Sequence, residues 1–457
     1  MTYGLLRALA GIALRWYYRD IQVQGRERIP TGAPLLLVVN HPNALVDALV
    51  VGTVVPRRVL ITAKATLFAN PIAAALLRYL GVLPLRRAAD VREDERRNPA
   101  RNDDTFRAVR EALGRRGAVL IFPEGKSHDE PELAPLKSGA ARMALQAHRS
   151  GDAPRLTVVP IGLTFERKES PRTRVLVQVG EPICLDDWAA PEGRREVEAL
   201  TSEIDVRLRA VTLNFSSADR AARATALASL ITAIMLEPPA IGARDRRLAL
   251  ETHLAGRIDA IRSELDAASP ELRARVDRLL TDLLAIHAEL RSRRIRLEDV
   301  SISRRWRDGL RFIFRESWIL LTAGPLALWG RINHWLPLRL ARAIAARSVE
   351  SAADPAMRTI VAGLGLILLA YAAQGIAVGM LFGTVTAVIY LVSLPVAADV
   401  NFRLSDRLAR ATQRARTFLL FRSQPELQRT LMATLARLRD ETAEVEKELG
   451  GRRTGGN

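Results

Sequence analysis

The chain has 457 residues, of which 48% are hydrophobic and 26% are charged. This length allows two or three domains, and the balance is typical of a globular protein rather than a disordered one. A single cysteine, Cys184, excludes an intramolecular disulfide and a thiol-rich metal site. The formal net charge of +18 predicts an anionic partner: nucleic acid, an anionic membrane surface or acidic substrates.

Residues 1–20 predict an amphipathic helix, with apolar positions on one side and Arg7, Arg15 and Arg19 on the other. One interpretation is a helix that lies in a membrane interface, with its arginines at the lipid headgroups. The other is an amphipathic helix packed on its own domain. The arginines within the apolar run, and the lack of a small-residue cleavage site after it, argue against a signal peptide.

Residues 21–195 alternate short apolar runs with helical patterns, which predicts an α/β domain whose sheet is covered on both faces. The runs that predict buried or extended strands are 34–40, 58–62, 82–85, 118–122, 156–164 and 175–179. The segments between them that predict helices are 43–54, 66–80, 103–115 and 137–149.

Residues 196–300 change character and predict a helical extension, rich in Ala, Leu, Arg and Glu and broken at Pro238-Pro239 and at Pro270. We expect no functional site there, because the segment carries no motif. Residues 423–457 predict a further helix followed by a disordered tail from Gly450 onwards.

Residues 301–422 predict a membrane-associated region, because 359–398 hold no charged side chain across 40 positions. One membrane-spanning helix needs about 20 apolar residues, so we expect two spans joined near Gln374-Gly375. Arginines flank both ends, which places both ends on the cytoplasmic side. The alternative is a buried helical pair in a soluble protein. Residues 317–330 are apolar but short for a span, so they either lie in the interface or re-enter.

His41 and Asp47 are the first candidate catalytic pair. His41 follows the strand 34–40, and Asn43 is a favourable N-cap for a helix whose first turn holds Asp47. Such an aspartate can fix the imidazole tautomer and leave the other ring nitrogen free to accept a proton. The pair therefore indicates a general base acting on a substrate hydroxyl, although most isolated His-Asp pairs are structural.

Three further segments carry candidate substrate-binding residues. Arg86 and Arg87 follow the run 82–85, where paired arginines can hold a phosphate. The segment Ile121-Phe-Pro-Glu-Gly-Lys-Ser-His128 adds candidates just past a buried strand, followed by a lysine at the start of the next helix. These candidates are Glu124, Gly125, Lys126, Ser127 and Lys137. The last segment, Val158-Val-Pro-Ile-Gly162, is an apolar strand that enters a tight turn.

In order and spacing, these segments resemble the four motifs of the glycerophospholipid acyltransferases over residues 30–185. The segment from Lys64 to Pro71 also resembles the stretch between the family's first two motifs. Five residues instead of four separate His41 from Asp47, and Lys-Ser-His follows the Glu-Gly pair where Thr-Arg-Ser is usual. Both departures are similar to the fungal-type glycerol-3-phosphate and dihydroxyacetone-phosphate acyltransferases, which also carry C-terminal membrane spans. With Thr-Arg missing, Arg86, Arg87 or Lys137 would have to supply the charge that binds phosphate.

The resemblance implies an α/β acyltransferase domain with a helical C-terminal extension and a two-helix transmembrane hairpin. It implies transfer of an acyl group from acyl-CoA or acyl carrier protein, as co-substrate, to glycerol 3-phosphate or 1-acylglycerol 3-phosphate, with His41 and Asp47 catalytic. We expect no cofactor, no metal and no nucleic-acid partner, and we expect contact with anionic membrane lipids. The expected location is a bacterial inner membrane, with the catalytic domain on the cytoplasmic side. Acylation of dihydroxyacetone phosphate or another lysolipid, and a non-catalytic lipid-binding role, stay open.

Overall fold

The structure is a computed structural model that describes residues 2–69, 71–79, 81–85, 100–168, 170–235, 247–265, 269–347 and 355–454. The chain divides into two compact units, each described here by itself. The first unit comprises Met1–Ala218 and Ser348–Ile360. The second unit comprises Asp219–Arg347 and Val361–Asn457.

The first unit is built on an eight-stranded mixed sheet in the order β1-β7-β6-β2-β5-β3-β4, with β8 paired to β6. The strands from β6 to β4 are parallel, while β7 runs antiparallel to β6 and β1 runs parallel to β7. The strands are β1 (Asp20–Gln24), β2 (Leu35–Val39), β3 (Val59–Lys64), β4 (Val82–Leu85), β5 (Ala118–Ile121), β6 (Thr157–Phe165), β7 (Arg174–Val179) and β8 (Ile183–Cys184).

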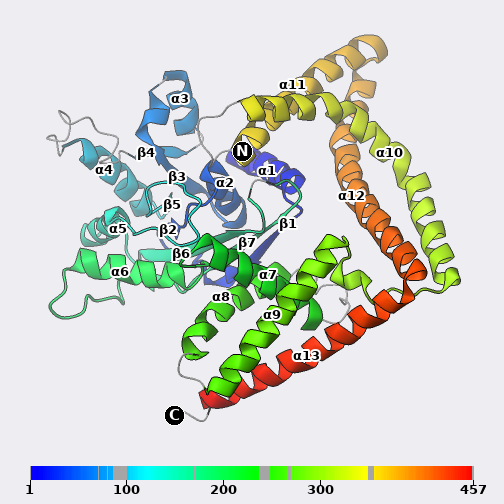
Figure 1. The fold of residues 1–457 in the computed structure, drawn as a ribbon. Coiled ribbons are helices and arrows are strands. Elements are labelled where there is room, and N and C mark those ends of the chain that lie inside the picture. The colour runs from blue at the N-terminus through cyan, green and yellow to red at the C-terminus, as the bar shows by residue number, and fades with distance from the viewer. Residues whose placement is uncertain are drawn as a thin grey trace. The chain divides into compact units, whose positions relative to one another are not determined.

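Helices cover both faces of this sheet, as the apolar strands predict. In β2, Leu35, Leu37 and Val39 face the core under α1 and α2, whereas Leu36 and Val38 face the core under α4, α5 and α6. The helices of this unit are α1 (Thr2–Tyr17), α2 (Ala44–Val54), α3 (Pro71–Tyr79), α4 (Ala100–Gly114), α5 (Gly139–Arg149) and α6 (Glu196–Arg209), joined by the short helices η1 (Arg26–Arg28) and η2 (Ala65–Phe68) (Figure 1).

The predicted α/β domain is confirmed, and most predicted strands and helices end within a few residues of their observed bounds. The predicted boundary at residue 195 is wrong, because the first unit continues to Ala218. Helix α6 belongs to this unit, since Leu200 and Ile204 are buried in the same core as α5. The strands β1 and β8 were not predicted, because the first has only five residues, of which two are apolar, and the second has only two residues.

Helix α1 packs on α2 of its own domain. Leu14 and Tyr17 are buried, and the Arg7 guanidinium donates to the Thr53 carbonyl at 2.9 Å. These contacts favour the interpretation as a packed amphipathic helix. Leu5 and Ile12 remain exposed, so contact of this helix with a membrane interface stays a prediction.

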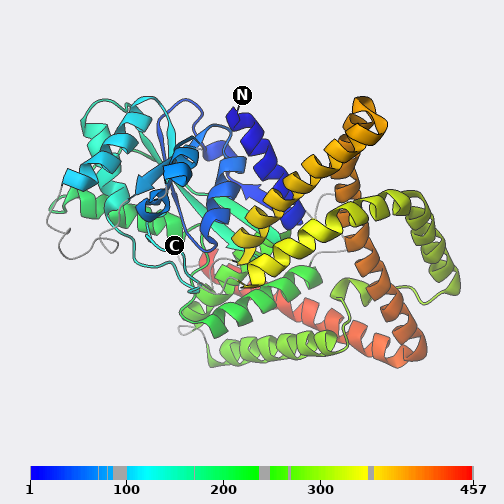
Figure 2. The same ribbon diagram turned by 90° about the horizontal axis from the view of Figure 1, so that it is seen from above.

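The described part of the second unit contains a helical layer and a group of three further helices (Figure 2). The layer consists of α7 (Ala218–Met235), α8 (Arg247–Leu265), α9 (Pro270–Ser292), the short η6 (Leu297–Asp299) and α13 (Pro425–Thr454). Its core joins Leu283 of α9 to Leu438 of α13. Pro270 begins α9, where the Ser269 hydroxyl caps the Leu272 amide at 3.3 Å. The predicted disorder from Gly450 is not observed up to Thr454, because α13 continues to that residue. The predicted break at Pro238-Pro239 lies outside the described residues.

The three further helices are α10 (Trp306–Arg347), α11 (Pro355–Phe382) and α12 (Thr384–Ser423). Residues 317–330 fall inside α10. Two segments are long and apolar enough to cross a membrane, Ala362–Phe382 and Thr384–Ser423. The predicted joint at Gln374-Gly375 is wrong, because the chain turns at Gly383, whose φ is +86°. Gly375 stays helical, and its missing side chain makes room for Leu391 of α12.

Candidate active site

The carboxyl end of β2 carries His41, at the edge of the sheet where α/β domains place their ligands. Asn40 fixes this point of the chain against β6. Its side-chain amide donates to the Leu163 carbonyl at 3.1 Å, and its oxygen accepts from the Leu163 amide at 2.7 Å. The neighbouring strand β5 ends next to β2 and leads into the loop that holds Glu124, so two of the predicted segments meet at one edge.

The His41 imidazole and the Asp47 carboxylate meet, with Nδ1 3.0 Å from Oδ2. The same Oδ2 accepts the Asn43 amide at 2.8 Å, and the Asp47 side chain is fully buried. A carboxylate can only accept, so Nδ1 carries the proton and Nε2 carries the lone pair of a neutral ring. No hydrogen bond to Nε2 is found among the described residues. The ring also stacks on Phe122 at 3.7 Å between centroids, which fixes its plane.

Burial raises the pKa of Asp47 above its ordinary value. The hydrogen bonds from His41 and the Asn43 amide pull that pKa down but do not cancel the effect of burial. The second carboxylate oxygen, Oδ1, is buried and has no partner among the described residues. Asp47 is therefore a costly residue for the fold, which is typical of a functional group.

The extra residue between His41 and Asp47 is accommodated where the chain enters α2. Ala44 takes the left-handed conformation with a φ of +45°, and its amide donates to the Ser127 hydroxyl at 3.2 Å. Asn43 occupies the N-cap position but does not cap through its side chain. Its side-chain amide instead donates to the Tyr18 hydroxyl at 3.1 Å. Burial raises the pKa of Tyr18, so this hydroxyl stays protonated.

Glu124 is buried and its carboxylate accepts from three groups of the protein. Oε1 accepts the backbone amide of His41 at 2.8 Å, and Oε2 accepts the backbone amide of Ala134 at 2.9 Å. Oε2 also meets Nε2 of His128. Nδ1 of His128 accepts the Glu130 amide at 3.2 Å, so the proton of a neutral ring lies on Nε2 and points at Glu124. The carboxylate thus holds His41 against the loop after β5.

Gly125 and Lys137 lie together beside this carboxylate. Gly125 has a φ of +75°, and a Cβ on it would stand 2.8 Å from the Lys137 ammonium. The Lys137 backbone amide donates to the Pro123 carbonyl at 2.9 Å, which closes the loop. Lys126 is exposed on the same loop. Only a glycine lets Lys137 cross the backbone here, so the loop brings a cation to the edge that carries His41.

Arg86 and Arg87 lie outside the described residues. Strand β4 ends at Leu85, whose register partner on β3 is Lys64 at the same carboxyl edge of the sheet. Three residues of the site were not predicted as site residues: Tyr18, Phe122 and His128. The sequence carried a signal only for His128, which lies four residues after Glu124 and can therefore turn back onto it.

The chain is similar in sequence to known acyltransferases. A family model described as "Acyltransferase" matches residues 20–164. The glycerol-3-phosphate O-acyltransferase 2 of Saccharomyces cerevisiae is 38% identical over 117 residues, which cover 25% of this chain and 16% of the yeast protein. The 1-acyl-sn-glycerol-3-phosphate acyltransferase of Cocos nucifera is 29% identical over 201 residues, which cover 42% of this chain and 59% of the coconut protein.

A solved structure of the 1-acyl-sn-glycerophosphate acyltransferase from Thermotoga maritima is also similar, with 20% identity and a TM-score of 0.34. The match covers 46% of this chain and 78% of the Thermotoga maritima chain. The chain spans less than a fifth of the yeast relative's length and less than two thirds of the coconut relative's. The matched segment carries His41, Asp47 and Glu124. Residues 20–164 therefore match the acyltransferase family model, and this segment is similar to acyltransferases that act on glycerolipids.

Proposed function

We propose that this protein transfers a fatty acyl group from acyl-CoA or acyl carrier protein to a hydroxyl of glycerol 3-phosphate or 1-acylglycerol 3-phosphate, in phospholipid synthesis. The observation that carries the proposal is the 3.0 Å contact between His41 Nδ1 and Asp47 Oδ2, with Nε2 left for a substrate. The intact pair also argues against a non-catalytic lipid-binding protein, in which nothing would maintain a buried carboxylate beside a histidine.

His41 acts as the general base in this proposal. Nε2 takes the proton of the acceptor hydroxyl as its oxygen attacks the carbonyl carbon of the thioester. The tetrahedral intermediate then expels the thiolate, and Nε2 gives this leaving group the proton that it took from the hydroxyl. The products are an ester and a free thiol. Asp47 holds the ring orientation and stabilises the imidazolium that forms between the two steps.

The acceptor phosphate is bound in this proposal by the cations at the same edge of the sheet. Lys137 lies over Gly125, while Lys126 is exposed on the same loop. Arg86 and Arg87, which directly follow β4 in the sequence, are proposed to add to this charge. Ser127 and Glu124 serve mainly by ordering the loop, because both accept hydrogen bonds from the segment 41–44.

Replacement of His41 by alanine tests the proposal. The purified His41→Ala protein is assayed with radiolabelled acyl-CoA and glycerol 3-phosphate, and kcat is expected to fall by about 10²–10⁴-fold. His148→Ala is the matched control, because His148 pairs with Asp186 at 3.5 Å on the surface of the same domain. The control is expected to retain wild-type turnover. Wild-type turnover by His41→Ala protein would refute the role of the base.

The acceptor is tested with a panel of hydroxyl compounds and one acyl-CoA. The His-x5-Asp spacing and the Lys-Ser-His continuation favour glycerol 3-phosphate over 1-acylglycerol 3-phosphate, because they are similar to the fungal-type enzymes. Dihydroxyacetone phosphate and other lysolipids complete the panel. We expect glycerol 3-phosphate to show the highest kcat/KM, and a higher value for a lysolipid would move the assignment to that acceptor.

The location belongs to this proposal as well. Two long apolar helices indicate membrane association. We place the protein in a bacterial inner membrane, with the acyltransferase domain on the cytoplasmic side, because arginines flank both ends of the apolar stretch. The relatives include enzymes of yeast, of plants and of Bacillus subtilis. Fractionation of the native host, with protease added to sealed membranes, tests this placement.

A further inference from the structure

Most of the exposed large apolar side chains in the described part of the chain lie on the helices α10, α11 and α12. We propose that the hairpin of α11 and α12 enters one leaflet of an anionic bilayer without crossing it. In this proposal the turn at Gly383 lies in the hydrocarbon, and the arginine-rich ends of α10 and α12 lie on the headgroups of the same leaflet. A hairpin that crosses the membrane is the alternative the sequence favours.

The length of the paired apolar arms supports insertion without crossing. The two arms face each other about Gly383, because Gly379 lies against Ala387 and Gly375 lies against Leu391. Asp399 is the first charged residue of α12, so its uncharged arm is 384–398, opposite 368–382 of α11. An arm of this length rises about 22 Å. The hydrocarbon core is about 30 Å thick, so the paired arms do not reach across it.

The uncharged segment of α11 extends further, to residue 359, and two positions in its lower part are buried or touch α10. Ile367 is buried, and Gly363 lies against Ala341 of α10. At the same distance from the turn on the other arm, α12 carries Asp399 and Arg403, an exposed ion pair at 2.8 Å. The ion pair on α12 places this level of the hairpin at the polar side of the leaflet, and contact with α10 at Gly363 accounts for part of the uncharged stretch of α11.

The turn itself has an apolar surface. Met380, Leu381, Phe382 and Val385 expose 82%, 74%, 68% and 76% of their surfaces. A turn at a far headgroup layer would be expected to carry charged residues, tryptophan or tyrosine. Backbone groups at the turn have partners, since the Gly383 amide donates to the Gly379 carbonyl and the Thr386 hydroxyl donates to the Phe382 carbonyl. Such a turn is suited to hydrocarbon.

A polar belt, which we define as Trp329, Asn333, His334, Tyr371, Tyr390 and Ser393, crosses the three helices below the turn. Tyr390 donates to Asn333 at 2.7 Å, the Trp329 indole donates to Ser393 at 3.2 Å, and His334 meets Tyr371 at 2.6 Å. The belt stands seven to ten residues from Gly383 on α12, which is about 10–15 Å. A spanning hairpin would be expected to carry aromatic anchors at the far interface as well, whereas residues 379–386 around the turn hold no tryptophan or tyrosine.

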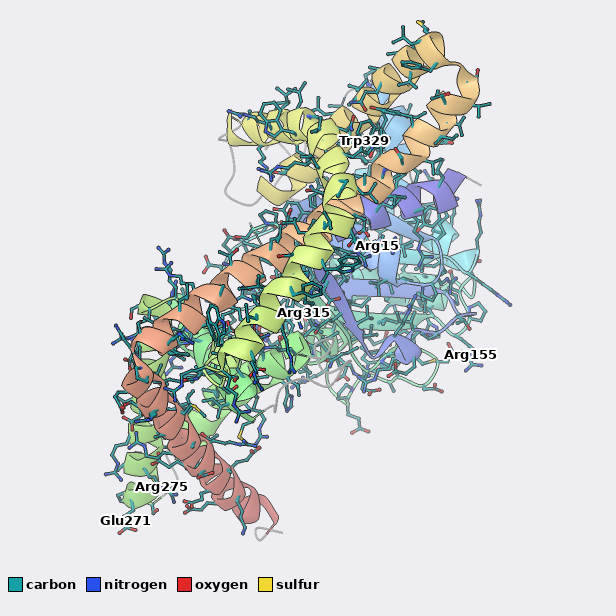
Figure 3. The ribbon with its side chains drawn as sticks, turned by 90° about the vertical axis from the view of Figure 1, so that its right-hand side faces the viewer. Arg15, Arg155, Glu271, Arg275, Arg315 and Trp329 are labelled. Carbon is teal, nitrogen blue, oxygen red and sulfur yellow. The ribbon has the colours of Figure 1, made fainter. Side chains whose placement is uncertain are left out.

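The ends of α10 and α12 beyond the belt supply positive charge for an anionic leaflet. These ends pair antiparallel, since Arg407 of α12 binds Glu316 of α10 at 2.7 Å and Gly309 faces Phe418. Figure 3 marks Arg315 and Trp329 on α10, at the charged end and in the belt respectively. Residues 306–316 and 399–423 together hold nine arginines and only four carboxylate side chains, so these ends carry a net positive charge. Exposed Ile313, Phe314 and Leu419 lie among them, as in a helix at a lipid surface.

Cysteine accessibility tests this insertion in the full-length chain. The Cys184→Ala background has no other cysteine. Val385→Cys places a thiol at the turn, and Thr430→Cys places a control thiol on exposed α13. Each protein is reconstituted into sealed vesicles of phosphatidylglycerol and phosphatidylcholine, with a membrane-impermeant maleimide on both sides. Leu381→Cys is a second turn position, in case one replacement fails to fold.

The thiol at residue 430 is expected to react without detergent. The thiol at residue 385 is expected to react only after detergent is added, and a fluorophore on it is expected to be quenched by lipids that carry a quencher in the acyl chain. Reaction at 385 in intact vesicles overturns the proposal, because the turn then lies in water. If residue 385 reacts, a second experiment with the maleimide on one side only shows whether the hairpin crosses the bilayer or lies outside it. Reaction from the side opposite to 430 shows a crossing hairpin, and reaction from the same side shows a hairpin outside the bilayer.

Discussion

Asp47 is buried, carries one oxygen without a partner among the described residues, and has a raised pKa. The unfolded chain releases this proton near the ordinary value of 3.8, whereas the folded chain holds it to a higher pH. Below pH 3.8 Asp47 is protonated in both the folded and the unfolded chain, so no buried charge destabilises the fold. As pH rises above 3.8 the unfolded chain ionises first, so the fold loses stability until the pH has passed the raised folded-state pKa of Asp47.

Asp47→Asn is therefore expected to lower activity and raise stability together. The amide oxygen still accepts from His41, but the charge that stabilises the imidazolium is lost, so kcat falls by about 10²-fold or more. The free energy of unfolding at pH 7 rises on the order of 1 kcal/mol, and this gain shrinks as pH falls through the folded-state pKa. Thermal unfolding in detergent at several pH values measures it. Asp152→Asn, at an exposed pair with Arg110, is the control. A variant less stable than wild type at pH 7 contradicts the argument.

Glu124 gives a second prediction at the scale of one residue. Its carboxylate accepts from the His41 amide, the Ala134 amide and His128, whereas a glutamine offers one acceptor oxygen and a donor. Glu124→Gln leaves buried donors without acceptors, at about 1–3 kcal/mol each. We expect a lower unfolding temperature and a lower kcat, because His41 is no longer held. Glu130→Gln, an exposed change on the same loop, serves as the control. Equal stability of the two variants would show that Glu124 does not brace the loop.

The residue types of this site were predictable, but most of its contacts were not. His41, Asp47 and Glu124 stood in motifs whose order and spacing are specific. The sequence did not mark Phe122 and Tyr18 as site residues, because an aromatic side chain beside apolar residues is expected to belong to the hydrophobic core. Only the folded structure shows their contacts with His41 and Asn43. The contacts of Glu124 were not predictable either, since its three hydrogen-bond donors come from chain segments whose approach depends on the packed sheet.

At the scale of the element, the loop after β5 depends on Gly125. Gly125→Ala adds a Cβ 2.8 Å from the Lys137 ammonium and forces a left-handed conformation on a residue with a side chain. Lys137 must move away from the site, so the KM for a phosphate-bearing acceptor is expected to rise several-fold, with a stability loss of about 1–2 kcal/mol from backbone strain. Steady-state kinetics at saturating acyl-CoA measure the change in KM.

Gly193→Ala separates strain from displacement. Gly193 has a φ of +77° and nothing within 4 Å of an added Cβ, so it carries the same strain without a neighbour to displace. The control is expected to lose similar stability and keep its KM. If both variants keep the wild-type KM, Lys137 does not bind the acceptor.

Elements were predictable where hydrophobic periodicity alone decides them. The strands β2, β5 and β6 are buried on both faces, so their apolar runs marked them. The helix joint was not predictable, because 359–398 have no charge to mark a turn, and Gln374-Gly375 resembles a break more than Gly383 does. Contact between α11 and α12 keeps Gly375 helical, and that contact is tertiary. The boundary at residue 195 failed for a similar reason, since α6 is helical by composition but packs on the sheet.

At the scale of the whole molecule, all described site residues lie in the first unit, while the helices proposed to enter lipid lie in the second. Each unit can therefore be altered separately. Gly330 on α10 is a suitable position for testing helix packing in the second unit, because a Cβ there would stand 2.2 Å from the Ala397 carbonyl oxygen of α12. Small residues at such crossings let helix backbones approach in the absence of a hydrophobic driving force.

Gly330→Ala is expected to push α10 away from α12, since a backbone carbonyl cannot rotate aside as a side chain can. The unfolding temperature in detergent falls, and protease cleavage within α10 and α12 becomes faster. Gly324→Ala, on the same helix, meets only Leu320 of its own helix at 3.6 Å, so it leaves stability unchanged or raises it by about 0.5–1 kcal/mol. Because no site residue touches Gly330, turnover of a water-soluble acceptor below the unfolding temperature stays at the wild-type level in both variants. A loss of turnover in Gly330→Ala, with unfolding unchanged, would mean that packing in the second unit controls the acyltransferase domain directly.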